Sequence, residues 1–252
     1  VEALNIRRER LGAHHPEVAT LLLRIANAYR YMNRFEQAES LFTEALEIRR
    51  SVYGQSHPEV AEAWYYLGLL MVANLKDIDR GLRFYTEAAT VFKSTLDETN
   101  PNLIAAETRI AGIFLESGRY QEAIALYKEL HQRMTERFGA DHSQLLNILS
   151  RLNLALRRNG DFDDAEEYAG RALAIARKAF GEKHPTTAIA MKDLAVIYGD
   201  EGRYVEGEEL LNESVATMEE AAGNLRPDFM GVVEGELGRI CIGLGRYSEA
   251  ET

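Results

Sequence analysis

The sequence predicts an all-α protein, a right-handed superhelical solenoid of antiparallel helix pairs, on the strength of two observations. A boundary motif recurs with its proline position at residues 16, 58, 101, 143, 185 and 227. Successive positions are separated by 42 residues, except for one interval of 43. A fixed period in this range indicates a stacked repeat array. A turn motif lies 25 residues before five of these positions, so each repeat contains two helices.

The boundary motif joins the end of one helix to the start of the next. Its clearest copy is Tyr53-Gly54-Gln55-Ser56-His57-Pro58. Glycine accepts the left-handed conformation that closes a helix, and proline suits the first helical position. The residue before the proline is held in an extended conformation, as a capping position requires. We therefore expect a sharp helix-to-helix junction at every copy.

The turn motif separates the two helices within a repeat. Its copies are Asn33-Arg34-Phe35, Lys76-Asp77-Ile78, Gly118-Arg119-Tyr120, Gly160-Asp161-Phe162, Gly202-Arg203-Tyr204 and Gly245-Arg246-Tyr247. The spacing leaves each helix roughly four to five turns. Repeats 2 and 6 each contain one extra residue, which falls in their first helix.

The repeats follow from these motifs as residues 16–57, 58–100, 101–142, 143–184 and 185–226, numbered 1 to 5. Residues 1–15 form part of a preceding repeat, since Ala3–Arg8 aligns with Ala45–Arg50 one period later, and residues 227–252 begin repeat 6. We expect one solenoid over residues 1–252 and read it as a fragment of a longer protein. Terminal repeats of solenoids usually carry polar caps, which neither end shows.

Large and small residues alternate at helical spacing, and this pattern predicts which residues form the core. The first helices carry an apolar residue followed by a mostly small one, as in Leu67-Gly68, and the second helices pair Phe42 or Tyr85 with nearby small residues. Such alternation is typical of interdigitated helix packing. We expect these aromatic residues, and Trp64 in the first helix of repeat 2, to lie in the core.

This pattern resembles the tetratricopeptide repeat family, most clearly in repeat 2 with Trp64, Leu67, Gly68, Tyr85 and Ala88. The 42-residue period and the Gly-x-x-His-Pro-x-Val-Ala boundary are similar to the longer-helix subclass typified by kinesin light chain. The resemblance implies that the first helices line a concave groove and the second helices form the convex back. The paired asparagines that help kinesin light chains to hold cargo are replaced here, for example by Leu23-Arg24 and Tyr65-Tyr66.

The resemblance places a candidate peptide-binding groove on the first helices, away from their core face. Its residues are Leu23, Arg24, Asn27, Arg30, Tyr65, Tyr66, Leu69, Thr108, Arg109, Asn147, Ser150, Arg151, Leu154 and Arg157. Arginines beside aromatic residues suit a partner peptide that carries acidic residues and an apolar anchor. Arg24, Arg109 and Arg151 share one slot and predict a positive strip. The alternative is a set of solvated helix faces on which arginines pair with neighbouring glutamates.

Catalytic chemistry is not predicted. His15, His57, His142 and His184 recur at the boundary about 42 residues apart, so stacked repeats would hold them apart rather than gather them around a metal ion. Cys241 is expected to be a buried structural thiol. The phosphate-binding, zinc-protease and dinucleotide-binding motifs are absent. We therefore expect a non-enzyme without cofactor, metal site or catalytic residues.

The charge and composition narrow the class of partner. The net charge is −11 and the chain has one cysteine, which disfavours nucleic acid, anionic membrane surfaces and a disulfide framework. We expect a cytoplasmic protein–protein interaction scaffold that binds peptide segments of a partner, with its oligomeric state left open. The alternatives are a regulatory or sensor segment of a larger enzyme or signalling ATPase, and a self-associating scaffold.

Overall fold

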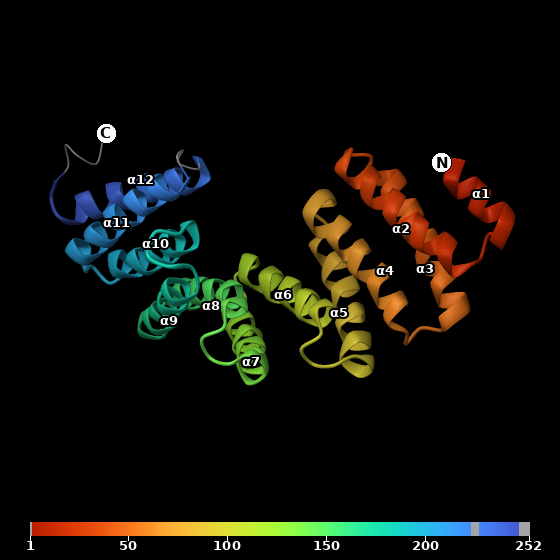
Figure 1. The fold of residues 1–252 in the computed structure, drawn as a ribbon, viewed down its shortest axis with the longest axis horizontal. Helices are drawn as coiled ribbons and strands as arrows, with labels where there is room; N and C mark the ends of the chain where they lie inside the picture. Colours follow the sequence, from red (N-terminus) through yellow and green to blue (C-terminus); the bar gives the residue numbers. More distant parts are fainter. Residues whose placement is uncertain (1, 223–226, 247–252) are drawn as a thin grey trace. The chain divides into compact units, whose positions relative to one another are not determined.

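The computed structural model describes residues 2–222 and 227–246, and throughout these ranges every regular element is helical. The all-α prediction is confirmed. The helices of the first half (Figure 1) are α1 (Glu2–Leu11), α2 (Pro16–Tyr31), α3 (Phe35–Tyr53), α4 (Pro58–Leu69), the π-helix η1 (Leu70–Leu75), α5 (Ile78–Thr95) and α6 (Pro101–Glu116). Those of the second half are α7 (Tyr120–Phe138), the 3₁₀-helix η2 (Ser143–Leu145), α8 (Leu146–Asn159), α9 (Phe162–Phe180), α10 (Pro185–Asp200), α11 (Tyr204–Ala222) and α12 (Pro227–Gly243).

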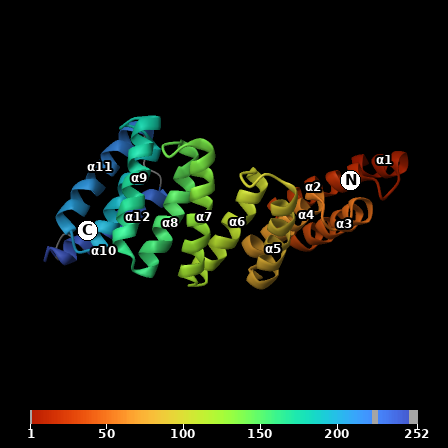
Figure 2. The ribbon, with the colours of Figure 1, turned by 90° about the horizontal axis from the view of Figure 1, so that it is seen from below.

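The helices form two compact units, unit 1 over residues 1–117 and unit 2 over residues 118–252. Within unit 1, α2 packs on α3 and α4 on α5, and each second helix also contacts the first helix of the next repeat. Unit 2 repeats this arrangement, with α8 on α9 and α10 on α11; Figure 2 shows α7 and α8 side by side. The division falls inside repeat 3, between α6 and α7. One continuous solenoid stays a prediction.

The boundary residue before each proline position caps the following helix, as expected. His15, His57, Asn100, His142 and His184 are all extended at their backbone, and each side chain accepts a hydrogen bond from the backbone N–H two residues on. For three of the histidines the ring also lies against the aromatic residue four positions earlier, with centroids 4.4 Å apart in the case of Tyr53 and His57. The repeated histidine is therefore a structural capping device.

The turn within each repeat uses a left-handed residue. Glycine supplies it in the later repeats, while Asn33 (φ 58°) and Lys76 (φ 59°) supply it in repeats 1 and 2. Lysine rarely adopts this conformation, and its presence confirms that Lys76-Asp77-Ile78 is a copy of the motif. Asp77 also caps α5 by accepting the N–H of Arg80 at 3.1 Å.

The extra residue of repeat 2 is taken up in its first helix, as the sequence predicts, and the structure places it at the end of that helix. α4 changes to the π-helix η1 after Leu69; a π turn holds one more residue than an α turn. In repeat 6 the additional residue lengthens the helix instead: α12 has 17 residues, against 16 in α2, α6 and α10. The second helix of repeat 2, α5, has 18 residues, against 19 in α3, α7, α9 and α11.

The core lies between the paired helices and matches the predicted alternation of large and small side chains. Phe42, Tyr85 and Tyr127 are fully buried, and Trp64 is 7% exposed. The ring of Tyr85 lies so close to Gly68 that a methyl group there would come within 2.9 Å of it. Cys241 is buried, as expected. The boundary residues 223–226 and the start of the second helix of repeat 6, residues 247–252, lie outside the described residues.

Candidate functional site

The groove predicted for unit 1 centres on two tyrosines of α4. Tyr66 stacks on Phe42 of α3, with ring centroids 5.7 Å apart and an interplanar angle of 5°. Tyr65 meets Tyr66 and Tyr85 edge-on, at centroid distances of 5.9 and 5.4 Å. Because both rings are held by aromatic neighbours, they present a preorganised surface, which lowers the entropy lost when a ligand binds.

A small hollow opens beside these tyrosines. Its volume is about 120 Å³, and it is lined by Glu62, Tyr65 and Tyr66 of α4, Phe92 of α5, and Asn102 and Ala105 of α6. Burial raises the pKa of Tyr66, and the nearby carboxylate of Glu62 raises it further. The phenol therefore stays protonated at neutral pH and can donate a hydrogen bond. The hollow combines an apolar wall with donor and acceptor groups at its edge, in the manner of an anchor pocket for one side chain.

The other groove residues of unit 1 lie in mixed environments. Arg24 is exposed, and no hydrogen bond or ion pair joins it to another described residue. Asn27 accepts a hydrogen bond from Arg30 at 3.0 Å, and Arg30 also lies over the ring of Tyr31. Leu69 and Thr108 are half-buried and Arg109 is exposed. Only Leu23 departs from the expected face, since it is 5% exposed and belongs to the core of α2.

Two groove residues of unit 2, Ser150 and Arg157, pair with acidic residues of the next first helix. The hydroxyl of Ser150 on α8 donates to Asp193 of α10 at 3.0 Å, and Arg157 of α8 donates to Asp200 of α10 at 3.1 Å. Asp200 in turn forms an ion pair with Arg239 of α12 at 2.9 Å. The charge of Arg157 is thus neutralised within the unit. In this part of the chain the alternative interpretation, arginines paired with acids, describes the polar contacts.

The last three groove residues, Asn147, Arg151 and Leu154, also lie on α8. Arg151 donates a hydrogen bond to Asn147 at 3.1 Å, one turn earlier, and both stay accessible. Leu154 is 37% exposed. Arg151 is therefore the arginine of the predicted strip in unit 2 that has no carboxylate partner among the described residues.

The sequence analysis missed a buried cation that holds the tyrosine-bearing helix in place. Arg49 of α3 is 2% exposed, donates to the backbone oxygen of Glu59 at 2.6 Å, and forms ion pairs with the carboxylates of Glu59 and Glu62. It thereby fixes Glu62, which lines the hollow beside Tyr65 and Tyr66. A signal was present: the same slot holds Phe92, Met134, Ala176 and Met218 in the later repeats, which marks position 49 as a core position.

Over residues 2–222 and 227–246, the histidines, cysteine and acidic residues form no group of three or more arranged to hold a metal ion. None of the helices in the described ranges has the length and apolar character needed to cross a bilayer.

Comparison with known families supports the resemblance to the tetratricopeptide repeat family. The family model described as tetratricopeptide repeat matches residues 1–51, 20–94, 59–136 and 144–220, which together cover most of the chain. The protein KINESIN LIGHT CHAIN-RELATED 2 of Arabidopsis thaliana is 24% identical over 228 residues, 90% of this chain and 34% of the relative. The mitochondrial tetratricopeptide repeat protein 19 of Rattus norvegicus is 31% identical over 109 residues, 43% of this chain and 29% of the relative. The chain thus spans about a third of the length of these curated relatives.

Solved structures show the same fold at low sequence identity. The nearly identical TPR-like repeats of a Podosopora anserina protein assigned as a kinesin light chain superpose with a TM-score of 0.73 at 21% identity, covering 81% of this chain and 96% of that one. A Rap protein, solved in complex with Competence and Sporulation Factor, superposes with a TM-score of 0.59 at 15% identity, covering 92% and 71%. At these identities the likeness concerns the fold alone.

Proposed function

Because the chain belongs to the tetratricopeptide repeat family, we propose that it is a non-catalytic interaction module whose unit 1 groove binds a short segment of a partner protein. The observation that carries this proposal is the hollow of about 120 Å³ beside Tyr65 and Tyr66. Rigid aromatic side chains with a half-buried face are the residues that most often dominate the energy of protein interfaces. The hollow accepts one apolar side chain, and the flanking backbone of an extended segment lies along the first helices.

The partner segment is acidic on at least one side of its anchor residue. Arg24 is an exposed cation without a partner among the described residues, and Arg109 is also exposed. Both occupy the same slot on first helices of unit 1, and Arg24 offers a cation to a carboxylate near the anchor. A short segment that is disordered when free loses entropy on binding, and we expect its Kd in the micromolar range.

A location in the cytoplasm remains part of this proposal, supported by the single cysteine, Cys241, which is buried as a free thiol. A role as a regulatory segment or as a self-associating scaffold stays an alternative. Binding of a peptide by the isolated chain, without a change in its sedimentation, distinguishes the interaction module from self-association.

The test uses a peptide array in which one aromatic or branched apolar residue is flanked by aspartate or glutamate. Binding to the wild-type chain is compared with binding to Ala105→Met, which fills the hollow without removing either tyrosine, and to Arg158→Glu, a charge reversal on an exposed position of α8. The proposal predicts that Ala105→Met weakens binding by about tenfold or more, as the loss of an anchor pocket does, while Arg158→Glu changes little. Equal binding to all three proteins would reject the groove as the site.

A further inference from the structure

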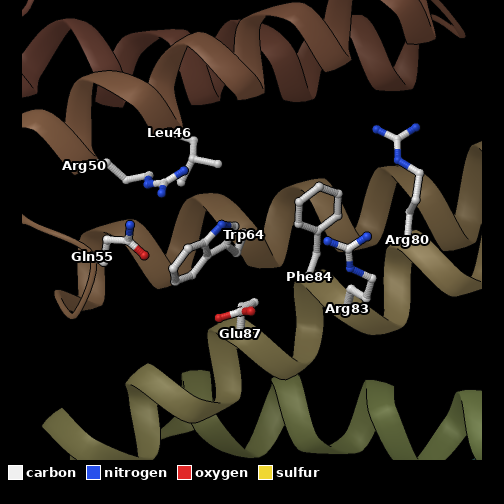
Figure 3. Close-up of a pocket in the computed structure, with 8 residues that line it drawn as sticks. All are labelled: Leu46, Arg50, Gln55, Trp64, Arg80, Arg83, Phe84 and Glu87. Carbon is white, nitrogen blue, oxygen red and sulfur yellow. The ribbon is translucent and has the colours of Figure 1, made fainter.

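A second and larger hollow lies in unit 1 on another side of α4, between the second helices α3 and α5. Its volume is about 440 Å³, within the range of ligand-binding pockets. Trp64 of α4 forms its floor, flanked by Leu46 of α3 and Phe84 of α5 (Figure 3). Trp64 and Leu46 are almost fully buried and Phe84 is half-buried. The floor is therefore apolar and fixed by the core beneath it.

The rim of this hollow is polar and mainly positive. Arg50 comes from α3, Gln55 from the turn before α4, and Arg80, Arg83 and Glu87 from α5. Figure 3 shows the side chains of Arg50 and Gln55 on one side of the indole and those of Arg80 and Arg83 on the side of Phe84. Three arginines against one glutamate leave the rim positive in a chain whose net charge is −11.

Two of the three arginines are free to meet a ligand. Arg80 is engaged by Glu39, with 2.6 Å between Nη2 and Oε1, and by Asp77. Arg50 and Arg83 are exposed, and neither side chain has a hydrogen bond or ion pair with any residue in the part of the chain that the structure describes.

Two slots of α5 carry arginine where the equivalent helices of the other repeats carry neutral or acidic residues. The slot of Arg80 holds Gln37, Glu122, Asp164 and Glu206 in the other repeats, and the slot of Arg83 holds Ser40, Ala125, Glu167 and Glu209. The floor differs too, because the slot of Trp64 holds Leu22, Glu107, Leu149, Met191 and Val233. The repeat framework therefore does not require Arg80 and Arg83, and in repeat 2 they occur beside Trp64, which belongs to the repeat pattern.

We propose that this hollow is a second docking site, which binds an acidic peptide segment through one apolar side chain placed on Trp64 and carboxylates paired with Arg50 and Arg83. Guanidinium groups bind carboxylates through paired, charge-assisted hydrogen bonds. The apolar floor accepts an aliphatic or aromatic side chain, and Glu87 accepts a backbone N–H of the bound segment. The site lies between the second helices α3 and α5, over Trp64 of α4, and works independently of the groove beside Tyr65 and Tyr66.

The rim favours a peptide over a nucleic acid or a polyphosphate. Glu87 places a carboxylate inside the site, where a phosphate would be repelled but a peptide N–H would find an acceptor. Strong nucleic-acid binding rests on neutralising several phosphates, and only two unpaired arginines are present. An acidic peptide mixes amide donors with spaced single charges, which matches this arrangement better.

Trp64 is the single tryptophan of the chain, so its fluorescence reports on this hollow directly. The probe is the capped pentapeptide acetyl-Glu-Glu-Leu-Glu-Glu-amide, titrated into the wild-type chain at low ionic strength. We expect a saturable change in the emission of Trp64 that weakens as salt rises, because exposed charges are screened. The same peptide with glutamine in place of glutamate, and inorganic phosphate, serve as comparison ligands and should give little change.

The matched variants separate this site from the groove. Arg50→Glu combined with Arg83→Glu should weaken the peptide by about tenfold or more, and the far-ultraviolet circular dichroism should stay unchanged because both side chains are exposed. Arg158→Glu, an equally exposed and unpaired position, and Ala105→Met in the groove should leave the titration unaltered. An unchanged Trp64 emission, an equal response to the glutamine peptide or to phosphate, or unweakened binding by the double variant would overturn the proposal. Loss of binding in Ala105→Met alone would assign the probe to the groove.

Discussion

Arg49 and Glu62 form an ion pair across the junction of α3 and α4, with Nη1 of the arginine 2.7 Å from Oε2 of the glutamate. The guanidinium is almost completely buried while the side chain of Glu62 is 40% exposed. The pair therefore places a positive charge in the core and leaves its partner in contact with water. It also links the junction between two repeats to the wall of the groove.

Two substitutions of Arg49 separate the contribution of its packing to stability from that of its charge. Arg49→Ala should lower the free energy of unfolding by about 3 kcal/mol, because it leaves a cavity and removes the contacts to Glu59 and Glu62. Arg49→Met should stay within about 1 kcal/mol of the wild type, since the side chain is of similar length and apolar, and Met134 and Met218 occupy the same slot. Urea unfolding followed by circular dichroism measures both; an equal loss in both variants would mean that the charge itself is required.

The histidine caps can be tested against an asparagine cap that the chain already contains. His184→Ala should destabilise unit 2 by about 1 kcal/mol, because the N–H of Thr186 loses its acceptor. His184→Asn should remain within about 0.5 kcal/mol of the wild type, since Asn100 caps α6 in the same way. Amide hydrogen exchange at the start of α10 is the measurement. Equal protection in His184→Ala and the wild type would show that the cap contributes nothing.

His131 predicts a pH dependence. Burial, and to a lesser degree the nearby Arg171, lower the pKa of this imidazole below its ordinary value of 6.5, so the folded state favours the neutral ring. Its contribution to stability is complete above pH 6.5 and is lost as the pH falls toward the lowered pKa of the folded state.

The melting temperature of His131→Leu should therefore fall less than that of the wild type between about pH 7.5 and pH 5. Leu46 and Leu173 fill the same slot in repeats 1 and 4, so the variant fits the repeat. Substitution of the exposed His14 by Gln is the control and should leave the slope unchanged. Parallel profiles for His131→Leu and the wild type would contradict the prediction.

Asn153 is a polar residue at a position where the other repeats carry alanine or glycine. It is 4% exposed, and its Oδ1 is buried without a hydrogen-bond partner among the described residues. Asn153→Ala should raise the free energy of unfolding by about 1 kcal/mol, since an unsatisfied amide is removed and Ala26 and Ala195 occupy the equivalent slots. Asn147→Ala, at an exposed position on the same helix, should give no gain. A loss of stability in Asn153→Ala would reveal a partner for the amide.

Trp64 should contribute strongly to the stability of the core, although its indole also forms the floor of the larger hollow. Trp64→Ala should cost about 3–5 kcal/mol, whereas Trp64→Leu should cost less because more of the buried volume is kept. Leu22 and Leu149 hold the same slot in repeats 1 and 4. The midpoints of urea unfolding compare the two variants, and a loss below about 1 kcal/mol for Trp64→Ala would mean that the indole packs poorly.

The regular features of the fold could be predicted from sequence because each depends on local geometry. Pro58 and its counterparts mark helix starts, the residues before them mark caps, and Lys76 was recognised as a turn residue from its spacing alone. These positions are fixed by backbone conformation within a few residues, and one period is enough to align them along the chain.

The site was less predictable because it depends on contacts between repeats. Arg49 looks like a surface residue until its slot is compared with Phe92 and Met134. The pairing of Arg157 with Asp200 joins residues 43 positions apart, and a helical wheel of one helix alone cannot show a partner on the other. Trp64 was placed correctly in the core, but its position beside Arg50 and Arg83 required the packing of α3 against α4 and α5.

The π-helix η1 shows how the array absorbs a change of length. One inserted residue turns everything after it by about 100° around the axis of an α-helix, which would move later core residues to the surface. The wide turn confines that rotation to residues 70–75, and the backbone of α5 makes room for it. A methyl group on Gly81 would lie 2.2 Å from Cγ2 of Val72, whereas repeats 1, 3 and 4 carry alanine in that slot and repeat 5, which has no insertion, carries Gly207. An added residue in one helix is thus matched by a missing methyl group in its neighbour, and the two changes act as a compensating pair that could be transplanted together into another repeat.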